Sequence, residues 1–316
     1  MSLRRSKSPI VMTLFAILLV LAIDQAKPLP AVRVGELLRG YGALLEARFN
    51  AGEAHQGLAA WLLGVAAPAV VVLVAQAVLL YLGADLLTLA LSVGVLYLTM
   101  GFRQFSHYFT DIHLALRMGE LDRARHLLGE WRGQPAEQLG SGEVARLAIE
   151  QALTCSHRHV FAPLFWFVLL GPAGALLYRL ALAFDRQWSE RRDAEFGSFG
   201  AFAAQAFAAL DWLPVRATAL AFAIVGDFED AIYCWRNQAQ RWPEPSAGIL
   251  LASGAGALGV RLGMPLRTDG DTADRPELGV GDDADADFMQ STIGLVWRTL
   301  VLGLLLLALL WIASWA

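Results

Sequence analysis

The sequence predicts an all-α protein, a polytopic integral membrane helical bundle with a small helical extramembrane block. Of its 316 residues, 56% are hydrophobic and only 17% are charged, and the mean hydropathy is +0.48. Ordinary soluble domains carry about 25% charged residues. Several apolar runs reach the roughly 20 residues that cross a bilayer core as a helix. Strands are not expected, because no segment shows the alternating pattern of a half-buried strand.

Composition also limits the partners and the chemistry. The net charge of −4 argues against a nucleic-acid-binding surface, and the apolar runs predict the lipid bilayer as a partner. Cys155 and Cys234 have no spacing typical of a zinc site or a disulfide framework, so both are expected to be buried small side chains. We expect a multi-pass protein of the inner (cell) membrane, whose oligomeric state the sequence does not indicate.

Residues 1–101 are predicted to form N-terminal membrane helices with an amphipathic segment. The apolar run 10–23 follows basic residues but precedes no small-residue cleavage site, so it is expected to remain as a short membrane helix. Residues 31–59 place apolar side chains at helical spacing, which predicts the amphipathic helix. The apolar runs 60–82 and 86–100 are joined by a tight turn and predict a membrane hairpin.

Residues 102–158 are predicted to form the helical extramembrane block. Gly119 and Gly133 delimit one helix with a single apolar face. Ser141 is expected to cap the next helix, which carries Glu143 in its first turn. Two signals disagree about the side of the membrane on which this block lies. Its seven arginines favour the cytoplasmic side, because positively charged loops tend to stay in the cytoplasm. A cytoplasmic basic N-terminus followed by three spans would place the block on the opposite side.

Residues 159–316 are predicted to form the membrane core. The stretch 160–184 contains a single charge, and Gly171 and Pro172 lie in its middle, which predicts a kinked membrane helix packed by its neighbours. A solvated acidic loop is expected at 264–290, before a C-terminal membrane helix. In total the sequence predicts four to five spanning helices.

Charged residues inside or beside the apolar runs predict an internal site. An ionised group in such a run must face the bundle interior or a water-filled cavity. We therefore expect one internal cavity lined by Asp185, Asp211, Arg216 and Arg261. A structural cluster of ion pairs among buried charges explains the same residues equally well.

His157 and His159 flank Arg158 at the start of the central apolar stretch. On a helix the two rings point to different sides, whereas in an extended turn they can share a metal. The alternative is that the three residues anchor the chain at the membrane edge, with Arg158 near lipid phosphates. The identity of any metal stays unknown.

Six segments in the second half of the chain carry a resemblance to a known family. They are Ala162–Trp166, Gly171–Arg179, Leu213–Arg216, Pro245–Gly248, Ala255–Gly263 and Asp287–Ile293. These segments occur in the same order as in the CobD/CbiB family of membrane proteins. The chain resembles that family from about Leu121 to the C-terminus. Members of that family with known chemistry are adenosylcobinamide-phosphate synthases, which join an aminopropanol phosphate arm to a corrinoid carboxylate with ATP and magnesium. The resemblance implies a corrinoid or another small molecule as ligand.

The resemblance also bears on the catalytic candidates. Glu150 stands at a position that is acidic in the family, Asp185 matches a family aspartate, and Asp211 matches a family asparagine. We take these three as catalytic candidates. The ligand-binding candidates are His157, His159, Arg216 and Arg261.

The chain departs from the synthases at several positions that are acidic or amide-bearing in the family. These positions hold Leu182, Phe207, Ala208, Ser246, Leu251 and the stretch Thr154–His159. Magnesium prefers oxygen ligands, so the departures imply a retained scaffold with a degenerate metal and ATP site. Magnesium and ATP are expected only if the synthase chemistry is retained. An enzyme of this kind would be an ATP-dependent amide-forming ligase.

A second branch offers a different function. The segments Met12–Leu21, His157–Phe167 and Leu210–Arg216 resemble AmpE, a related membrane protein tied to signalling in β-lactamase induction. That resemblance implies a non-catalytic membrane regulator or sensor, and it stays open beside the biosynthetic function.

Overall fold

The structure is a computed structural model that describes residues 9–26, 31–189, 191, 195–268, 271–273 and 275–313. It is predominantly helical, which confirms the predicted all-α class. The chain divides into two compact units. Unit 1 comprises residues 1–102, 158–214 and 305–316, and unit 2 comprises residues 103–157 and 215–304. The three-part division into 1–101, 102–158 and 159–316 stays a prediction.

Unit 1 is built from apolar helices and one amphipathic helix. In chain order it contains α1 (Pro9–Ala26), α2 (Ala31–Phe49), α3 (Ala54–Trp61), the π-helical turn η1 (Leu62–Ala66), α4 (Ala67–Tyr81), α5 (Asp85–Thr99), α9 (Ala162–Leu170), α10 (Pro172–Trp188), the first part of α11 (Ala201–Val225) and the end of α14 (Ala286–Ala313).

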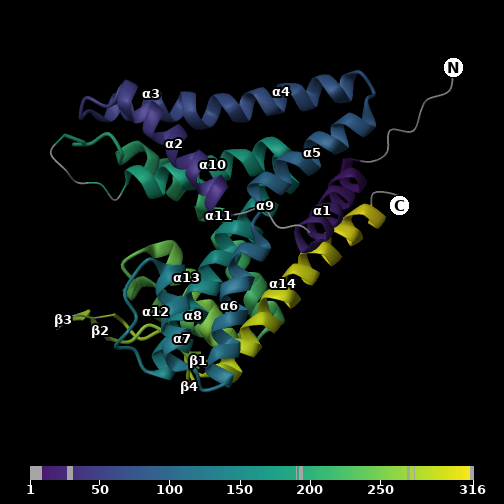
Figure 1. Cartoon of the computed structure of the whole chain (residues 1–316). Helices are drawn as coiled ribbons and strands as arrows, with labels where there is room; N and C mark the ends of the chain where they lie inside the picture. The colour runs from purple at the N-terminus through teal and green to yellow at the C-terminus, as the bar shows by residue number, and fades with distance from the viewer. Residues whose placement is uncertain are drawn as a thin grey trace. The chain divides into compact units, whose positions relative to one another are not determined.

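The helices α3, η1 and α4 form one continuous rod (Figure 1). Its 28 residues, Ala54–Tyr81, are long and apolar enough to cross a membrane. The turn that follows contains Gly83 at φ +65°, a conformation that glycine adopts at little cost. The chain then returns as α5, which packs against α4, as the hairpin prediction required.

The central apolar stretch forms two helices, so the prediction of one kinked helix was wrong. Helix α9 ends at Leu170, Gly171 adopts φ +65° and ψ −154°, and Pro172 begins α10. Glycine reaches this backbone region where other residues are strained, and Pro172 has no N–H to continue the α9 ladder. A full break results instead of a bend.

Helix α10 is the centre of unit 1, because it packs against α2, α4, α5 and α9. Its buried aromatic side chains join a cluster in which Phe184 lies 4.4 Å from Trp188 and Trp188 lies 5.0 Å from Phe199, measured between ring centroids. Tyr178 is fully buried, and its hydroxyl donates a 2.7 Å hydrogen bond to Asp211 of α11. One polar contact thus joins the two helices inside an apolar core.

Unit 2 holds the rest of the helices and all of the short strands among the described residues. It contains most of α6 (Phe102–Arg117), then α7 (Leu121–Arg132), α8 (Ser141–Ser156), the second part of α11, α12 (Phe228–Gln238), the 3-10 turn η3 (Ala239–Arg241), α13 (Pro245–Leu258) and the first part of α14. The π-helical turn η2 (His157–Phe161) begins in unit 2 and ends in unit 1.

The ends of α7 and α8 test two predictions about helix limits. Helix α7 runs from Leu121 to Arg132 and stops at Gly133 in the left-handed conformation, as predicted. Helix α8 does not use Ser141 as its cap. Gly140 occupies the cap position, and its N–H donates a 2.7 Å hydrogen bond to the Glu143 carboxylate. The Glu143 carboxylate thus satisfies the backbone N–H of the cap residue, as the N3 glutamate of a capping box does.

Small residues let α13 lie directly against α12 (Figure 1). A Cβ atom on Gly256 would lie 2.4 Å from the carbonyl oxygen of Asp230, and one on Gly248 would lie 2.3 Å from that of Ala239. Neither position has room for a larger residue.

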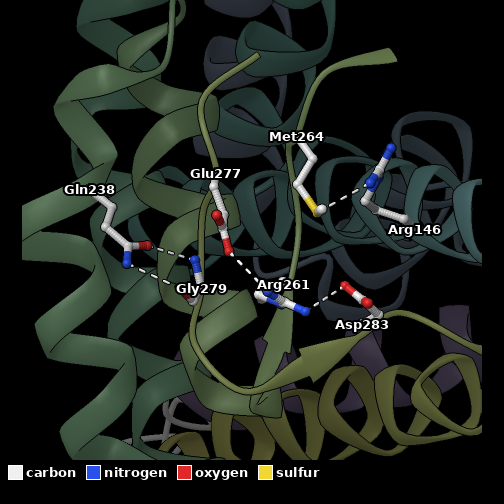
Figure 2. Close-up of polar contacts among 7 residues, drawn as sticks. All are labelled: Arg146, Gln238, Arg261, Met264, Glu277, Gly279 and Asp283. Atoms are coloured by element: carbon white, nitrogen blue, oxygen red, sulfur yellow. Dashed lines mark hydrogen bonds and ion pairs between the residues drawn. The ribbon is translucent and has the colours of Figure 1, made fainter. Parts of the chain in front are cut away.

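The expectation that the chain has no strands was wrong. Strand β1 (Val260–Arg261) pairs in parallel with β4 (Asp282–Asp283), and β2 (Leu266–Thr268) pairs antiparallel with β3 (Asp271–Ala273). Strands of two or three residues are too short to show alternation in the sequence. The predicted acidic loop contains most of them, and Gln238 fixes it by exchanging two hydrogen bonds with the backbone of Gly279 (Figure 2).

Three of the described helices are long and apolar enough to cross a membrane: Ala54–Tyr81, Ala201–Val225 and Ala286–Ala313. Helices Val11–Ala26 and Asp85–Thr99, which the sequence predicted as spans, are apolar but shorter. The protein is therefore a membrane protein. The number of four to five spanning helices stays a prediction.

Replacing Tyr178 with Phe should destabilise the protein by about 1–2 kcal/mol, because the buried Asp211 loses a hydrogen-bond donor. Thermal unfolding in detergent measures the change. The matched control is Tyr81→Phe, at a side chain that is 91% exposed, and it should leave stability unchanged. Equal effects of the two substitutions would contradict a role for the Tyr178 hydroxyl.

Replacing Gly256 with Ala should destabilise the protein by about 2–3 kcal/mol, because the added methyl group meets the backbone of α12. The control is Gly303→Ala, where a Cβ atom meets nothing within 4 Å. Chemical or thermal unfolding compares the two. A Gly256 variant as stable as the Gly303 variant would show that α12 and α13 do not pack as described.

Candidate functional site

A pocket of about 610 Å³ lies within unit 2. Its volume falls in the range of roughly 300–1,000 Å³ that is typical of small-molecule sites. The pocket is lined by Arg216, Trp235, Arg236, Ala239, Gln240, Trp242, Pro245 and Ile249. These residues come from α11, α12, η3, the short connection after it and α13.

Local sequence explains how the walls of this pocket form. The Asp227 side chain accepts a 3.1 Å hydrogen bond from the N–H of Asp230 and so caps α12. Pro245 occupies the first turn of α13, where its missing N–H costs little. Because Gly248 has no side chain, the start of α13 can approach the backbone of Ala239. The pocket residues are therefore held on short, well-anchored elements.

The chemistry of the pocket favours a planar or anionic ligand. Arg216 and Arg236 carry positive charge, and arginine binds carboxylate and phosphate through a planar fork of N–H donors. Trp235 and Trp242 offer flat apolar faces beside these charges.

A second polar centre of unit 2 surrounds Glu150. This side chain is buried, with 7% exposure. One carboxylate oxygen accepts a 2.9 Å hydrogen bond from the N–H of Gly263, and the other forms an ion pair with Arg275. The Arg275 guanidinium lies 4.9 Å from the centre of the Trp242 ring, so Trp242 belongs to both this centre and the pocket.

Two more arginines lie within electrostatic reach of Glu150. The pKa values of Arg146 and Arg132 are both lowered, chiefly because the two side chains are buried. The negative charge of Glu150 acts to raise these pKa values, and the positive charge of Arg275 acts to lower them. The Arg146 side chain is 7% exposed, and its Nη1 lies 3.3 Å from the Met264 sulfur (Figure 2). We call Arg132, Arg146 and Arg275 the arginine cluster. Guanidinium groups carry a positive charge in proteins.

Arg261 lies in β1 and has acidic partners in the same unit. Its Nη2 lies 2.9 Å from Asp283, and its Nη1 lies 3.8 Å from Glu277 (Figure 2). These contacts join β1 to β4 and to the loop before β4. Arg261 does not line the pocket, and the role that the structure gives it is to hold this loop.

The carboxylate candidates Asp185 and Asp211 belong to unit 1. Asp211 is buried, with 1% exposure, and accepts the hydrogen bond from Tyr178. Asp185 is half-buried on α10. Arg216 and Arg261, the other two charges of the predicted cavity, belong to unit 2. The shared cavity therefore stays a prediction.

The two histidines have different partners, as expected for residues two positions apart in a helical turn. His157 is buried, and its Nδ1 lies 3.0 Å from the hydroxyl of Thr218. His159 is half-buried, and its Nδ1 contacts the guanidinium of Arg179. The carbonyl of His159 also accepts a 3.2 Å hydrogen bond from the N–H of Gly101.

Sequence reasoning missed several residues of these sites. Arg146 lies four residues before Glu150, so the two charges fall on one face of α8, and this spacing was a usable signal. Trp235 and Trp242 carry no such signal. Arg275 lies in the acidic loop, and only folding brings it to Glu150.

The donor groups do not fit a magnesium ion bound by the protein alone. Across the described residues, no three His, Cys, Asp or Glu side chains lie close enough to hold a metal. Two of the buried carboxylates, Glu150 and Asp211, already accept hydrogen bonds from other groups.

Comparison with known proteins places the chain in a family. The family model described as "CobD/Cbib protein" matches residues 13–296. The chain is 37% identical to the cobalamin biosynthesis protein CobD of Stutzerimonas stutzeri over 267 residues, which are 83% of this chain and 86% of that one. It is 40% identical to the protein of that name from Chromobacterium violaceum over 196 residues, 62% of either chain.

The protein of the same name from Mycobacterium tuberculosis is 33% identical over 171 residues, which are 52% of this chain and 54% of that one. No solved structure matches the chain significantly. The family match covers most of the chain, including the residues around the pocket and Glu150. This chain therefore belongs to the CobD/CbiB family of proteins.

Proposed function

We propose that the protein acts in cobalamin biosynthesis as a multi-pass protein of the inner membrane that binds a corrinoid in the pocket of unit 2. One observation carries the proposal. Arg216 and Pro245 belong to two separate sequence segments that carry the family resemblance, and both line this one pocket. The curated relatives, which are named cobalamin biosynthesis proteins, support the same process.

The pocket residues suit the carboxylate-bearing edge of a corrinoid. The side chains of Arg216 and Arg236 would pair with the carboxylate, and Trp235 and Trp242 would cover apolar parts of the macrocycle edge. In the synthases of the family, ATP supplies the activation of that carboxylate. The residues of this chain would bind the corrinoid and fix its orientation.

The proposal includes a metal and ATP site that is degenerate relative to the synthases. Three positions that are polar in those enzymes are core positions here: Leu182, Phe207 and Leu251 are 1%, 5% and 3% exposed. Phe207 packs against Tyr178, with ring centroids 5.6 Å apart. Because each of these three positions is buried in the core of its own unit, a polar group placed there would lose its hydration. Glu150, Asp185 and Asp211 remain as catalytic candidates.

Corrinoid binding tests the proposal directly. The purified protein in detergent should bind cobyric acid in equilibrium dialysis, followed by the visible absorbance of the corrinoid. Arg216→Gln should weaken binding about tenfold, because one charged hydrogen bond to the carboxylate is worth about 1.5–3 kcal/mol. The matched control is Arg241→Gln, at an exposed arginine near the pocket that does not line it. A corrinoid whose carboxylate is already an amide should bind more weakly.

A rescue experiment then separates binding from catalysis. The gene is expressed in a strain that lacks its synthase and is supplied with cobyric acid. Corrinoid binding without cobalamin-dependent growth supports the degenerate site, whereas growth would show that catalysis survives. A membrane-inserted protein that neither binds corrinoid nor rescues growth would contradict the proposal and favour the AmpE-like regulator.

A further inference from the structure

We infer that a hinged arm of unit 2 sets the position of Trp242 and so controls the shape of the pocket. The arm has two limbs, residues 262–268 and 275–278, with β3 between them. The pocket exists whichever small molecule it takes, so the inference does not depend on the corrinoid. It rests on the pairing of the limbs, a strained turn near their base and the contacts of Arg275.

The two limbs form one antiparallel hairpin. At the base, Leu262 and Leu278 exchange two backbone hydrogen bonds of 2.7 and 2.9 Å. Further out, the N–H of Met264 donates a 3.4 Å hydrogen bond to the carbonyl of Pro276, and then β2 pairs with β3 (Figure 1). Because the limbs are bonded to each other, the arm can move as one body.

The base of the arm is fixed to the helices. Gln238 of α12 exchanges two hydrogen bonds with the backbone of Gly279 (Figure 2). Gly279 and Gly281 have φ values of +96° and +102°, which side-chain-bearing residues rarely adopt. A Cβ atom on Gly279 would lie 2.1 Å from the carbonyl oxygen of Val260. The chain thus enters the arm through a tight turn, and movement takes place beyond it.

The first limb contains a strained residue. Gly263 has φ +75°, and Met264 follows with φ +66°. In the part of the chain that the structure describes, Met264 is the only residue other than glycine with a positive φ. A long side chain is strained in this conformation, which persists only where surrounding contacts impose it. Strain of this kind gathers in clamps and switch segments. The strain at Met264 therefore opposes the closed position of the arm.

Glu150 of α8 holds the arm closed against this strain. Its carboxylate accepts a 2.9 Å hydrogen bond from the N–H of Gly263 in the first limb. The same carboxylate forms an ion pair with Arg275 in the second limb. Breaking a buried ion pair is costly, because each charge is left without its partner. One side chain thus fastens both limbs.

Trp242 connects the arm to the pocket. The Arg275 guanidinium lies 4.9 Å from the centre of its ring, and a Cβ atom on Gly263 would lie 3.2 Å from its Cζ3 atom. Both limbs therefore lie against the indole, which also lines the pocket beside Arg216. When the arm opens, Trp242 loses these contacts and is free to leave the pocket wall. A ligand that contacts Trp242 in one of the two positions shifts the balance between them.

The competing explanation is a permanent structural clasp. In a clasp, amide hydrogens of the arm exchange with solvent only when unit 2 unfolds as a whole. Substitutions there would then change exchange in the arm and in the core of the unit alike. In a hinged arm, local opening lets the arm exchange faster than the core and respond to substitutions separately.

Hydrogen–deuterium exchange followed by mass spectrometry tests the arm without any ligand. The sample is the full chain in phosphatidylcholine nanodiscs. The two limbs report opening of the arm, and the buried residues 250–257 of α13 are the internal reference. The limbs of the unmodified protein should exchange at least about tenfold faster than this reference, because local opening requires less free energy than unfolding of the unit.

Glu150→Gln should raise exchange in the limbs about tenfold, because it keeps an acceptor for the Gly263 N–H but removes the ion pair with Arg275. Exchange in residues 250–257 should stay unchanged. The matched control is Glu120→Gln, at an exposed glutamate paired with Arg123, and it should leave the arm unaffected.

Substitutions at the two neighbouring turn residues should have opposite effects. Gly263→Ala should raise exchange in the limbs about tenfold, because the new Cβ atom would lie 2.0 Å from the carbonyl oxygen of Pro276. Met264→Asn should lower exchange about fivefold, because asparagine tolerates the left-handed conformation better than methionine does.

The connection to the pocket has its own test. Trp242→Leu should raise exchange in the limbs about fivefold, because Arg275 loses the aromatic face beneath it. The matched control is Trp235→Leu, at the tryptophan that lines the same pocket from α12, and it should leave the limbs unchanged.

Either of two results would overturn the inference. One is that the limbs and residues 250–257 exchange at the same rate and change together in the variants. The other is that Trp242→Leu affects the limbs no more than Trp235→Leu does. Corrinoid binding enters neither measurement, so this inference and the proposed function can fail separately.

Discussion

The buried carboxylate of Glu150 is the interaction on which the assembly of unit 2 depends. It accepts a hydrogen bond from Gly263, just after β1, and pairs with Arg275 in the loop before β4. Helix α8 thereby holds two segments that lie more than 100 residues further along the chain. Desolvating a carboxylate costs several kcal/mol unless charge and hydrogen bonds offset it. The hydrogen bond from the Gly263 N–H and the ion pair with Arg275 offset that cost.

The apolar helices of this protein pack in two different ways. The long apolar helices keep large side chains on their outer faces; Val71 of α4 is 67% exposed and Leu86 of α5 is 78% exposed. In hydrocarbon such exposure costs nothing, because lipid tails are as apolar as the protein core. Helix α13 is apolar for another reason. It is almost fully buried, and its glycines allow backbone contact with α12. Hydropathy alone does not distinguish a helix that faces lipid from one that lies at the centre of a packed unit.

The site residues of this chain favour anion recognition. Arginine and tryptophan side chains line the pocket, whereas the buried carboxylates of Glu150 and Asp211 are already engaged in hydrogen bonds with Gly263 and Tyr178. Leu182, Phe207 and Leu251, which the resemblance implies replace polar groups of the synthases, are core rather than surface residues. A scaffold of this kind can keep its substrate contacts while its reactive groups change, because binding and chemistry use different side chains.

The sequence by itself determined the helical class, the membrane character, the family and the limits of helices such as α7, since apolar runs and glycine stops are local signals. Only the tertiary structure decided the break at Gly171, the short strands, and which charges meet. Asp211 accepts a hydrogen bond from Tyr178 of a different helix, and Glu150 pairs with Arg275 from a loop that the sequence marked only as acidic. The reason is physical: hydropathy and periodicity depend on neighbours along the chain, whereas the partner of a buried charge depends on groups that only folding brings within a few ångströms.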